Sequence, residues 1–309
     1  MEELGIKIKP GKSLFRLLLY MIVLGTSIQL VLMGLVLLVM KIMNPDSPLS
    51  FSFFQENTAA LKGILLMSSI FTFIVPAWTL YRSESRVNRY FERTGNISLV
   101  QYLLVFASML CFIPMMSLIA HWNESMQLPD SLQGIQQWMR SSEDSAAVMT
   151  KQIVEESTWL GLFINLIILA VVPAIGEEMV FRGCLQHIFG RWITNKHVVI
   201  WLVAILFSAF HLQFFGFFPR LLLGAFFGYL YIWSKNIYLP IFGHFINNAS
   251  ATITAFYYTR KGISFEQMNA FEQEPFWVYL ASLIFTVIFV VLYYRSTKKI
   301  PHGARLEED

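Results

Sequence analysis

The sequence predicts an all-α, polytopic integral membrane protein, a bundle of about eight transmembrane helices. Two observations lead to this fold class. First, 56% of the 309 residues are hydrophobic and only 14% are charged, whereas a soluble domain has about 25% charged residues. Second, long stretches carry no charge, and the first of them, Leu17–Met40, is long enough to cross a bilayer as a helix. It is too long for a signal-peptide core and no small-residue cleavage site follows it, so we expect it to remain as a membrane helix.

Seven further apolar stretches predict the other spans. They lie at about Gly63–Leu80, Val100–Ala120, Thr158–Ile175, Val198–Leu212, Leu221–Trp233, Ile237–Tyr258 and Phe276–Tyr294. Those near Val198 and Leu221 are short. The loop Trp122–Ser157 is expected to be either a short amphipathic helix or a plain surface loop. No long repeat or low-complexity tract interrupts the chain, which predicts a single membrane domain.

The distribution of positive charge predicts that both termini face the cytoplasm. Lys and Arg gather at the N-terminus, in alternate connections and in the C-terminal tail, as the positive-inside rule expects of cytoplasmic segments. The residues concerned are Lys7, Lys9, Lys12, Arg16, Arg82, Arg86, Arg89, Arg93, Arg191, Lys196, Lys235, Arg295, Lys298, Lys299 and Arg305. The net charge is only +3, so these cations indicate topology and no nucleic-acid partner is expected. Cys111 and Cys184 lie in apolar contexts without C-x-x-C spacing, which favours buried, inert thiols over a disulfide or a metal site.

Ionisable residues inside the apolar spans are the candidates for function, because each costs about 2.5–3.5 kcal/mol at the bilayer centre. Glu177, Glu178 and Arg182 end the fourth span. Glu178 and Arg182 are four residues apart, so they share a helix face and can form an ion pair. Glu177 is rotated by about 100° from Glu178, which leaves it to face a cavity. The alternative is an interfacial ion pair without a functional role.

Two more polar groups occur in the following spans. His211 ends the stretch "FSAFH", with Phe207 one turn earlier, and His244 and Asn248 lie four residues apart on one helix face. Weaker candidates are Asn165 and Asn247. Each group alone could simply form a hydrogen bond between helices. Their occurrence on consecutive or nearly consecutive spans favours a common site.

The chemistry of these groups suits amide hydrolysis. A carboxylate and an imidazole that face one water molecule can deprotonate it, and an imidazole beside an amide can donate hydrogen bonds to an oxyanion. Ser208 is the nearest serine to His211 but points away from its face, so a covalent route is not favoured. Glu177, His211 and His244 would suffice as zinc ligands. We favour the mechanism without a metal and expect no cofactor, with zinc as the alternative.

The three groups resemble the motifs of a known family. "EEMVFR" (Glu177, Glu178, Arg182), "FSAFH" (Phe207, His211) and "HFINN" (His244, Asn248) are similar to the E-E-x-x-x-R, F-x-x-x-H and H-x-x-x-N/B motifs of the CPBP intramembrane endopeptidases. That family includes the type II CAAX prenyl proteases, bacteriocin-processing and self-immunity proteins, and lysostaphin-resistance-like proteins. The resemblance covers about residues 155–255. It implies that Glu177 and His211 activate water, that His244 and Asn248 hold the oxyanion, and that Glu178 and Arg182 support the architecture.

The resemblance divides the chain into N-terminal spans (1–150), a CPBP-like catalytic core (151–260), and a last span with a cytoplasmic tail (261–309). The expected partners are the lipid bilayer and a membrane-associated protein or peptide substrate. The expected location is the bacterial inner membrane. For Glu177 to reach His211, we expect the fourth helix to continue toward Trp192, with the site in the cytoplasmic half of the membrane. The alternative functions are a non-proteolytic scaffold or immunity protein and, less favoured, a small-solute transporter.

Overall fold

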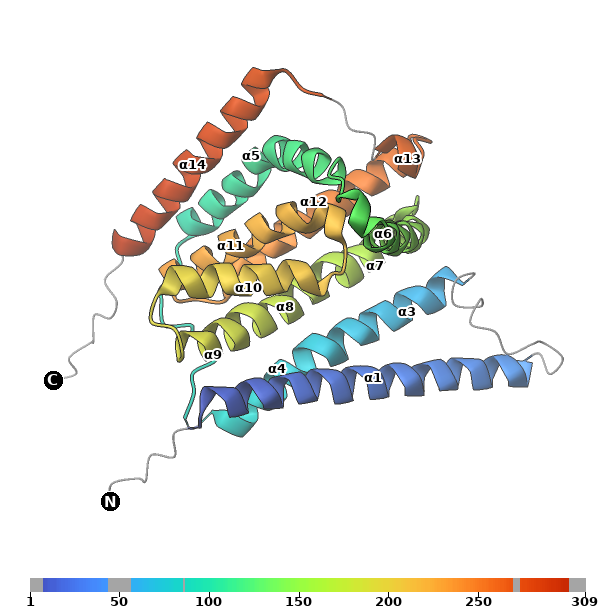
Figure 1. Ribbon diagram of the computed structural model, residues 1–309, viewed down its shortest axis with the longest axis horizontal. Helices are drawn as coiled ribbons and strands as arrows, with labels where there is room; N and C mark the ends of the chain where they lie inside the picture. Colours follow the sequence, from blue (N-terminus) through green and yellow to red (C-terminus); the bar gives the residue numbers. More distant parts are fainter. Residues whose placement is uncertain (1–7, 44–56, 86, 269–272, 300–309) are drawn as a thin grey trace. The chain divides into compact units, whose positions relative to one another are not determined.

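The protein is helical throughout the part of the chain that its structure, a computed structural model, describes. That part excludes residues 1–7, 44–56, 86, 269–272 and 300–309 (Figure 1). The α-helices are α1 (Pro10–Met43), α3 (Thr58–Ser69), α4 (Val75–Glu84), α5 (Leu99–Glu124), α6 (Gln133–Val154), α7 (Trp159–Asn165), α8 (Val172–Glu178), α9 (His187–Gly190), α10 (Lys196–Phe210), α11 (Phe217–Ser234), α12 (Tyr238–Arg260), α13 (Phe265–Met268) and α14 (Phe276–Lys299). Within these residues there is no strand, and the one isolated β-bridge joins Arg93 to Asn236. The predicted all-α class is confirmed.

All eight predicted spans lie on helices. Six helical stretches are long and apolar enough to cross a membrane: Pro10–Val39, Thr58–Glu84, Leu99–Glu124, Trp159–Gly190, Phe214–Ser234 and Phe276–Lys298. The predicted span Val198–Leu212 corresponds to the shorter apolar helix α10. The predicted span Ile237–Tyr258 corresponds to α12, whose length of 23 residues matches the others but which carries more polar side chains. The protein is therefore an integral membrane helix bundle. The number of eight spans stays a prediction.

The helices form two compact units, each built from separate parts of the chain. The first contains Met1–Tyr90, Ala146–Thr194 and Asn248–Met268, and the second contains Phe91–Ser145, Asn195–Asn247 and Asn269–Asp309. In the first unit, α1 lies along α3 and α4, and α8 packs against the helical turn Ile70–Ile74 (Figure 1). In the second unit, α14 lies along α5, and α10 lies along α11 (Figure 1).

In the described part of the chain, three helical stretches contain a segment of π-helix, and two of these segments precede a proline. The segments are η1 (Ile70–Ile74), η3 (Leu166–Val171) and η4 (Met179–Gln186). Pro76 follows η1 and Pro173 follows η3, each within the first two residues of the next α-helical segment. A proline ring clashes with the carbonyl group four residues earlier in an α-helix. The wider π-turn relieves this clash, so both helices continue through their prolines.

A side chain from α14 enters the backbone ladder of α5 in the second unit. The Ser282 hydroxyl donates a hydrogen bond to the Cys111 carbonyl oxygen at 2.6 Å and accepts one from the Met115 amide at 3.2 Å. Pro114 lies inside the same turn and has no amide hydrogen to contribute. In a regular α-helix the Met115 amide would donate to the Cys111 carbonyl oxygen. Ser282 bridges these two backbone groups instead and fixes α14 against α5.

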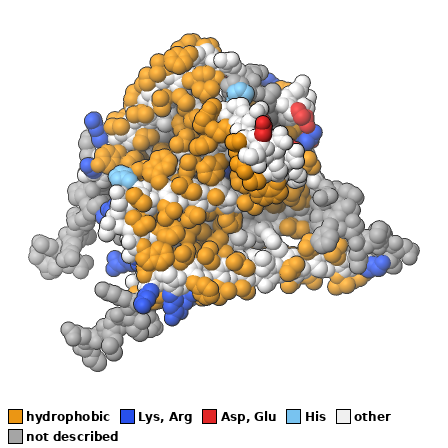
Figure 2. Space-filling model, in the orientation of Figure 1, with side chains coloured by type: hydrophobic (Ala, Val, Ile, Leu, Met, Phe, Trp, Pro, Cys, Tyr) orange, Lys and Arg blue, Asp and Glu red, His pale blue; other side chains and the backbone are white. Residues whose placement is uncertain are grey.

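Most of the surface that the helices expose is apolar. Large hydrophobic side chains such as Phe15, Leu30, Leu38 and Trp277 are more than half exposed, and hydrophobic side chains predominate on the face drawn in Figure 2. The second unit has a core of Val105, Met109, Leu223, Phe227, Leu230, Leu239 and Tyr293. A bilayer would cover the exposed apolar surface, because monomeric soluble proteins rarely leave so much of it in water.

The loop between α5 and α7 contains a helix, and both cysteines are at least partly buried. Residues Gln133–Val154 form the helix α6, so the helical alternative for this loop is confirmed. Cys184 is fully buried, as predicted, whereas Cys111 is only partly buried. Both thiols are free of disulfides.

Candidate active site

Glu177 and Glu178 end α8 in the middle of one continuous helix. This helix runs from Trp159 through α7, η3, α8, η4 and α9 to Gly190. The predicted continuation of the fourth span beyond Glu177 is therefore confirmed. The two acidic side chains consequently project from an unbroken apolar helix instead of from its end.

A glycine allows close packing at the turn that carries the acids. A Cβ atom at Gly176 would lie 2.9 Å from the Cβ atom of Phe73 and 3.1 Å from Cγ1 of Ile74. Separations below about 3 Å are closer than two carbon atoms tolerate. Gly176 thus lets α8 approach η1 directly, which fixes the backbone next to Glu177.

Glu178 and Arg182 form a buried ion pair. Oε1 of Glu178 lies 2.8 Å from Nη1 of Arg182, and both side chains have 0% exposure. Arg182 belongs to η4, and its guanidinium carbon lies 6.0 Å from the centre of the Phe181 ring. Glu177 is only partly buried. The pairing predicted from the four-residue spacing is therefore confirmed, and the two adjacent acids occupy different surroundings.

His211 caps the C-terminal end of α10 in the second unit. Its Nδ1 lies 2.9 Å from the carbonyl oxygen of Phe207. A carbonyl oxygen only accepts hydrogen bonds, so Nδ1 carries the proton and, in the neutral ring, Nε2 carries the lone pair. The backbone of its own helix thereby fixes the tautomer that a general base attacking through Nε2 requires.

His244 lies on α12 in the same unit, and Phe207 contacts both histidines. The rings of Phe207 and His211 have centroids 5.2 Å apart, and those of Phe207 and His244 lie 5.8 Å apart in an edge-to-face arrangement. The ring of His244 also stacks on Phe227 at 5.2 Å with an interplanar angle of 14°. His244 is only 4% exposed. Aromatic rings on two sides therefore hold the second imidazole in one orientation.

Asn248 follows one turn after His244 on α12 and belongs to the first unit. Its Nδ2 donates a hydrogen bond to the carbonyl oxygen of Leu169 at 3.0 Å. Leu169 lies in η3, on the helix that also carries Glu177. The bond to Leu169 uses one of the two N–H donors of the amide group and orients the side chain.

The structure thus describes the candidate residues in two sets. Glu177, Glu178, Arg182 and Asn248 belong to the first unit, and His211 and His244 belong to the second. The weaker candidate Asn165 has a structural explanation, because its Nδ2 donates to the Ile153 carbonyl oxygen at 2.8 Å. The hydroxyl of Ser208 donates to the Phe217 carbonyl oxygen at 2.6 Å, which agrees with its exclusion as a nucleophile.

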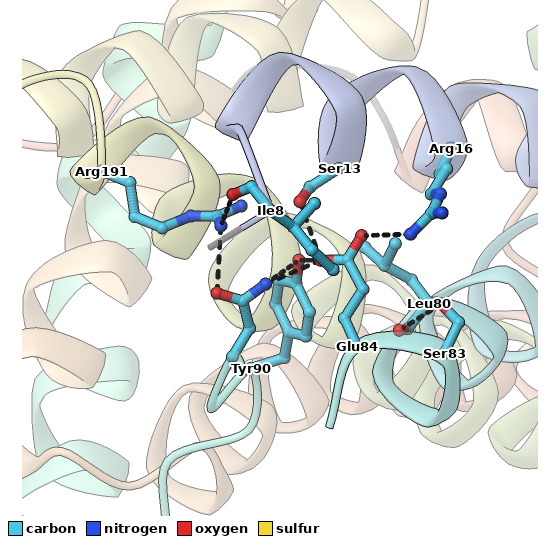
Figure 3. Close-up of polar contacts among 9 residues, drawn as sticks. Ile8, Ser13, Arg16, Leu80, Ser83, Glu84, Tyr90 and Arg191 are labelled. Carbon is cyan, nitrogen blue, oxygen red and sulfur yellow. Dashed lines mark hydrogen bonds and ion pairs between the residues drawn. The ribbon is translucent and has the colours of Figure 1, made fainter. Parts of the chain in front are cut away.

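A second buried polar cluster was not predicted from the sequence. The Glu84 carboxylate accepts hydrogen bonds from Ser13 Oγ at 2.8 Å, from Asn88 Nδ2 at 2.7 Å and from the Tyr90 hydroxyl, and it forms an ion pair with Arg16 at 3.2 Å (Figure 3). Burial and the hydrogen bond to Glu84 raise the pKa of Tyr90, so the phenol stays protonated as a donor. The signal in the sequence was Glu84 itself, an acid at the end of an apolar span.

Arg191 extends this cluster to the helix of the candidate site. Its Nη1 donates to Asn88 Oδ1 at 3.0 Å and to the Ile8 carbonyl oxygen at 3.2 Å (Figure 3). The sequence assigned Arg16 and Arg191 to membrane topology alone. The structure shows that they also join the start of α1 and the segment after α4 to the end of the helix that carries Glu177.

The part of the chain that contains every candidate residue is similar to a known protein family. Residues 157–250 match the family model described as "Type II CAAX prenyl endopeptidase Rce1-like". The uncharacterized protein YpbD of Bacillus subtilis (strain 168) is 29% identical over 89 residues, which are 28% of this chain and 42% of that protein. The match therefore spans less than half the length of that relative.

No solved structure matches the chain. The family match and the three motifs coincide, because Glu177, His211, His244 and Asn248 all fall between residues 157 and 250. Residues 157–250 are therefore similar to the Rce1-like, type II CAAX prenyl endopeptidases, in agreement with the resemblance of the three motifs to the CPBP family.

Proposed function

We propose that this protein is an intramembrane endopeptidase that hydrolyses a peptide bond of a membrane-associated protein or peptide. The observation that carries the proposal is the position of His211, whose Nδ1 lies 2.9 Å from the Phe207 carbonyl oxygen. In a histidine held in this way Nε2 carries the lone pair, so Nε2 is the nitrogen that would accept a proton. The match of residues 157–250 to a family model of endopeptidases supports the same conclusion.

In the proposed reaction, Glu177 and His211 remove a proton from one water molecule. The water oxygen attacks the carbonyl carbon of the scissile bond, and the carbonyl oxygen becomes an oxyanion. His244 and Nδ2 of Asn248 donate hydrogen bonds to it, which stabilises the charge that develops in the transition state. The proton taken from water then passes to the nitrogen of the leaving amine as the C–N bond breaks.

Glu178 and Arg182 have a supporting role in this proposal. Their side chains are fully buried against each other, so neither is available to a substrate. Breaking a buried pair leaves an uncompensated charge in a poorly solvated place. The pair therefore stabilises the helix turn that presents Glu177.

The proposed mechanism uses no metal ion. Glu177, His211 and His244 are suitable zinc donors in kind. Asn248 is a poor zinc ligand and a good hydrogen-bond donor to an oxyanion. These points support the glutamate-type mechanism over the metallo-type.

The decisive experiment compares wild-type membranes with membranes that contain Glu177→Gln. The substitution keeps the size of the side chain and removes the base, so we expect one or more peptide products to disappear from the membrane peptidome. Glu124→Gln is the matched control, because Glu124 is an exposed acid at the end of α5. Identical peptidomes for wild type and a folded Glu177→Gln variant would favour the alternative, a non-proteolytic scaffold or immunity protein.

A further inference from the structure

The turn directly after His211 is held by side chains from two other helices. The chain leaves α10 at His211, takes a left-handed conformation at Leu212 with φ of 53°, and enters the short helical turn η5 (Phe214–Gly216). The Cβ atom of a non-glycine residue is crowded by the following carbonyl oxygen when φ is positive. Such a conformation persists only where the surrounding structure imposes it.

Asn123 fixes the turn from α5. Its Nδ2 donates to the Phe214 carbonyl oxygen at 3.1 Å, and its Oδ1 accepts from the Phe218 amide at 2.9 Å. The side chain is 2% exposed. The side-chain amide of Asn123 therefore bonds to both ends of the turn, to the carbonyl oxygen of Phe214 and to the backbone amide of Phe218.

Glu143 fixes the middle of the same turn from α6. Its Oε2 accepts a hydrogen bond from the Phe215 amide at 3.0 Å. The guanidinium carbon of Arg140 lies 3.3 Å from the centre of the Phe215 ring, and Trp138 packs on Phe214 with centroids 5.4 Å apart. The first half of α6 therefore covers the turn and satisfies a backbone donor that follows His211 by four residues.

We propose that Glu143 and Asn123 are positioning residues for His211. This inference rests on the proposed function, because it assigns His211 to water activation. His211 is the residue that caps the C-terminal end of α10, and the end of a helix frays unless its backbone groups are bonded. By holding residues 214–218, the two side chains fix where α10 ends, and so keep the ring of His211 on the Phe207 carbonyl oxygen in the tautomer that activates water through Nε2.

The kinetic test uses Glu143→Ala, Glu143→Gln and Asp144→Ala in the full-length protein. Glu143→Ala removes the acceptor of the Phe215 amide, and we expect kcat to fall by about 10- to 100-fold, the scale of a small displacement of a catalytic group, with KM nearly unchanged. Glu143→Gln keeps an acceptor oxygen and should restore most of kcat. Asp144→Ala changes the exposed acid next in sequence and should match the wild type.

A second measurement is independent of any substrate. Nitrogen-15 NMR of the histidine side chains, with His211 assigned from a His211→Asn sample, should show a single Nδ1–H tautomer in the wild type. Glu143→Ala and Asn123→Ala should both give mixed tautomers for His211, whereas Asp144→Ala should not. If Glu143→Ala does not fold, Glu143→Met, which keeps the bulk of the side chain, takes its place.

The outcomes separate this inference from the proposed function. A wild-type protein that cleaves no substrate contradicts the proposed function, while the NMR result still decides whether Glu143 and Asn123 hold His211. An unchanged His211 signal in both variants overturns the inference. Equal loss of kcat in Glu143→Ala and Glu143→Gln also overturns it, because the negative charge of Glu143 and not its hydrogen bond would then matter.

Discussion

Glu178 and Arg182 lie side by side at 2.8 Å without exposure to solvent, so the carboxylate charge directly offsets the charge of the buried guanidinium. We expect Glu178→Gln to lower the free energy of unfolding by about 3–5 kcal/mol, because a buried guanidinium would lose its counter-charge. Thermal unfolding in detergent measures the loss. Activity should fall with stability, since the pair supports the turn that carries Glu177.

The matched control for this pair is another (i, i+4) pair of the same protein. Lys151 and Glu155 lie 3.9 Å apart, and both side chains are 39% exposed. Glu155→Gln should change the unfolding free energy by less than about 1 kcal/mol, as is usual for exposed pairs. Equal melting temperatures for Glu178→Gln and Glu155→Gln would contradict the structural role of the buried pair.

Asn248 distinguishes the two candidate mechanisms. In the proposed oxyanion mechanism, Asn248→Ala removes one hydrogen-bond donor and should lower kcat by about 10²–10³-fold, with little effect on KM. Purified protein should contain substoichiometric zinc, and prolonged chelation should leave its activity intact. Elemental analysis and steady-state kinetics provide both measurements.

The control for Asn248 is Asn165. Both side chains donate a hydrogen bond to a backbone carbonyl oxygen, Asn248 to Leu169 and Asn165 to Ile153. Asn165→Ala should therefore lose comparable stability and keep its kcat. Stoichiometric zinc, with activity lost on chelation and regained with added zinc, would make the protein a metalloprotease and would overturn the metal-free mechanism.

At the scale of elements, an extended segment ahead of α5 clasps the turn between α11 and α12. The amides of Thr94 and Gly95 donate to the Lys235 carbonyl oxygen at 3.2 and 3.4 Å, and the side chain of Asn236 donates to the Gly95 carbonyl oxygen at 3.0 Å. A Cβ atom at Gly95 would lie 1.8 Å from the Ser234 carbonyl oxygen. The clasp can therefore form only with glycine at this position.

We expect Gly95→Ala to destabilise the protein by about 1–3 kcal/mol, the usual cost of forcing an extra atom into packed structure. Gly63→Ala is the control, because Gly63 lies inside α3 with no atom within 4 Å of the added Cβ. Alanine stabilises a helix interior by about 0.5–1 kcal/mol over glycine. Thermal unfolding of the two variants should therefore shift in opposite directions, and a Gly95→Ala variant as stable as the wild type would refute the clasp.

The sequence predicted the helices better than the details inside them. Charge-free stretches such as Leu17–Met40 locate helices because burying a charge in lipid is costly, and each of the eight lies on a helix. The π-helical segments and the insertion of Ser282 between Cys111 and Met115 were not predictable. They depend on which helix packs against which, and a local pattern contains no such information.

The candidate site was predictable to a similar degree. Four-residue spacing correctly predicted the pair of Glu178 and Arg182. The bond from His211 to Phe207 and the cluster around Glu84 were missed, the latter because its members come from α1, α4 and the end of α9. The assignment of Glu177, His211, His244 and Asn248 to catalysis stays a prediction.

For the whole molecule, the cytoplasmic location of the two termini is a prediction, and both termini lie outside the described residues. The same topology predicts that Lys196, the first residue of α10, faces the cytoplasm and that Ser131, in the turn before α6, faces the other side. Both residues are exposed. Single cysteines at these positions, introduced with Cys111→Ala and Cys184→Ala, can be labelled with an impermeant maleimide.

In cells whose outer layer is permeable to the maleimide and whose inner membrane is intact, we expect Ser131→Cys to react. Lys196→Cys should react only after the inner membrane has been permeabilised. Inverted vesicles should give the opposite result. Labelling of Lys196→Cys and protection of Ser131→Cys in intact cells would reverse the orientation. Labelling of both from one side would require a different number of spans between them.

The hydrogen bond between Nδ1 of His211 and the Phe207 carbonyl oxygen also limits how protons move across the membrane during turnover. A carbonyl oxygen does not take up a proton at ordinary pH, so the ring cannot receive a proton at Nε2 and release one at Nδ1. In the proposed reaction, the proton taken from water returns through the same nitrogen to the leaving amine. The ring of His211 then passes no proton from one of its sides to the other, so a pH gradient across the membrane would not act through this residue.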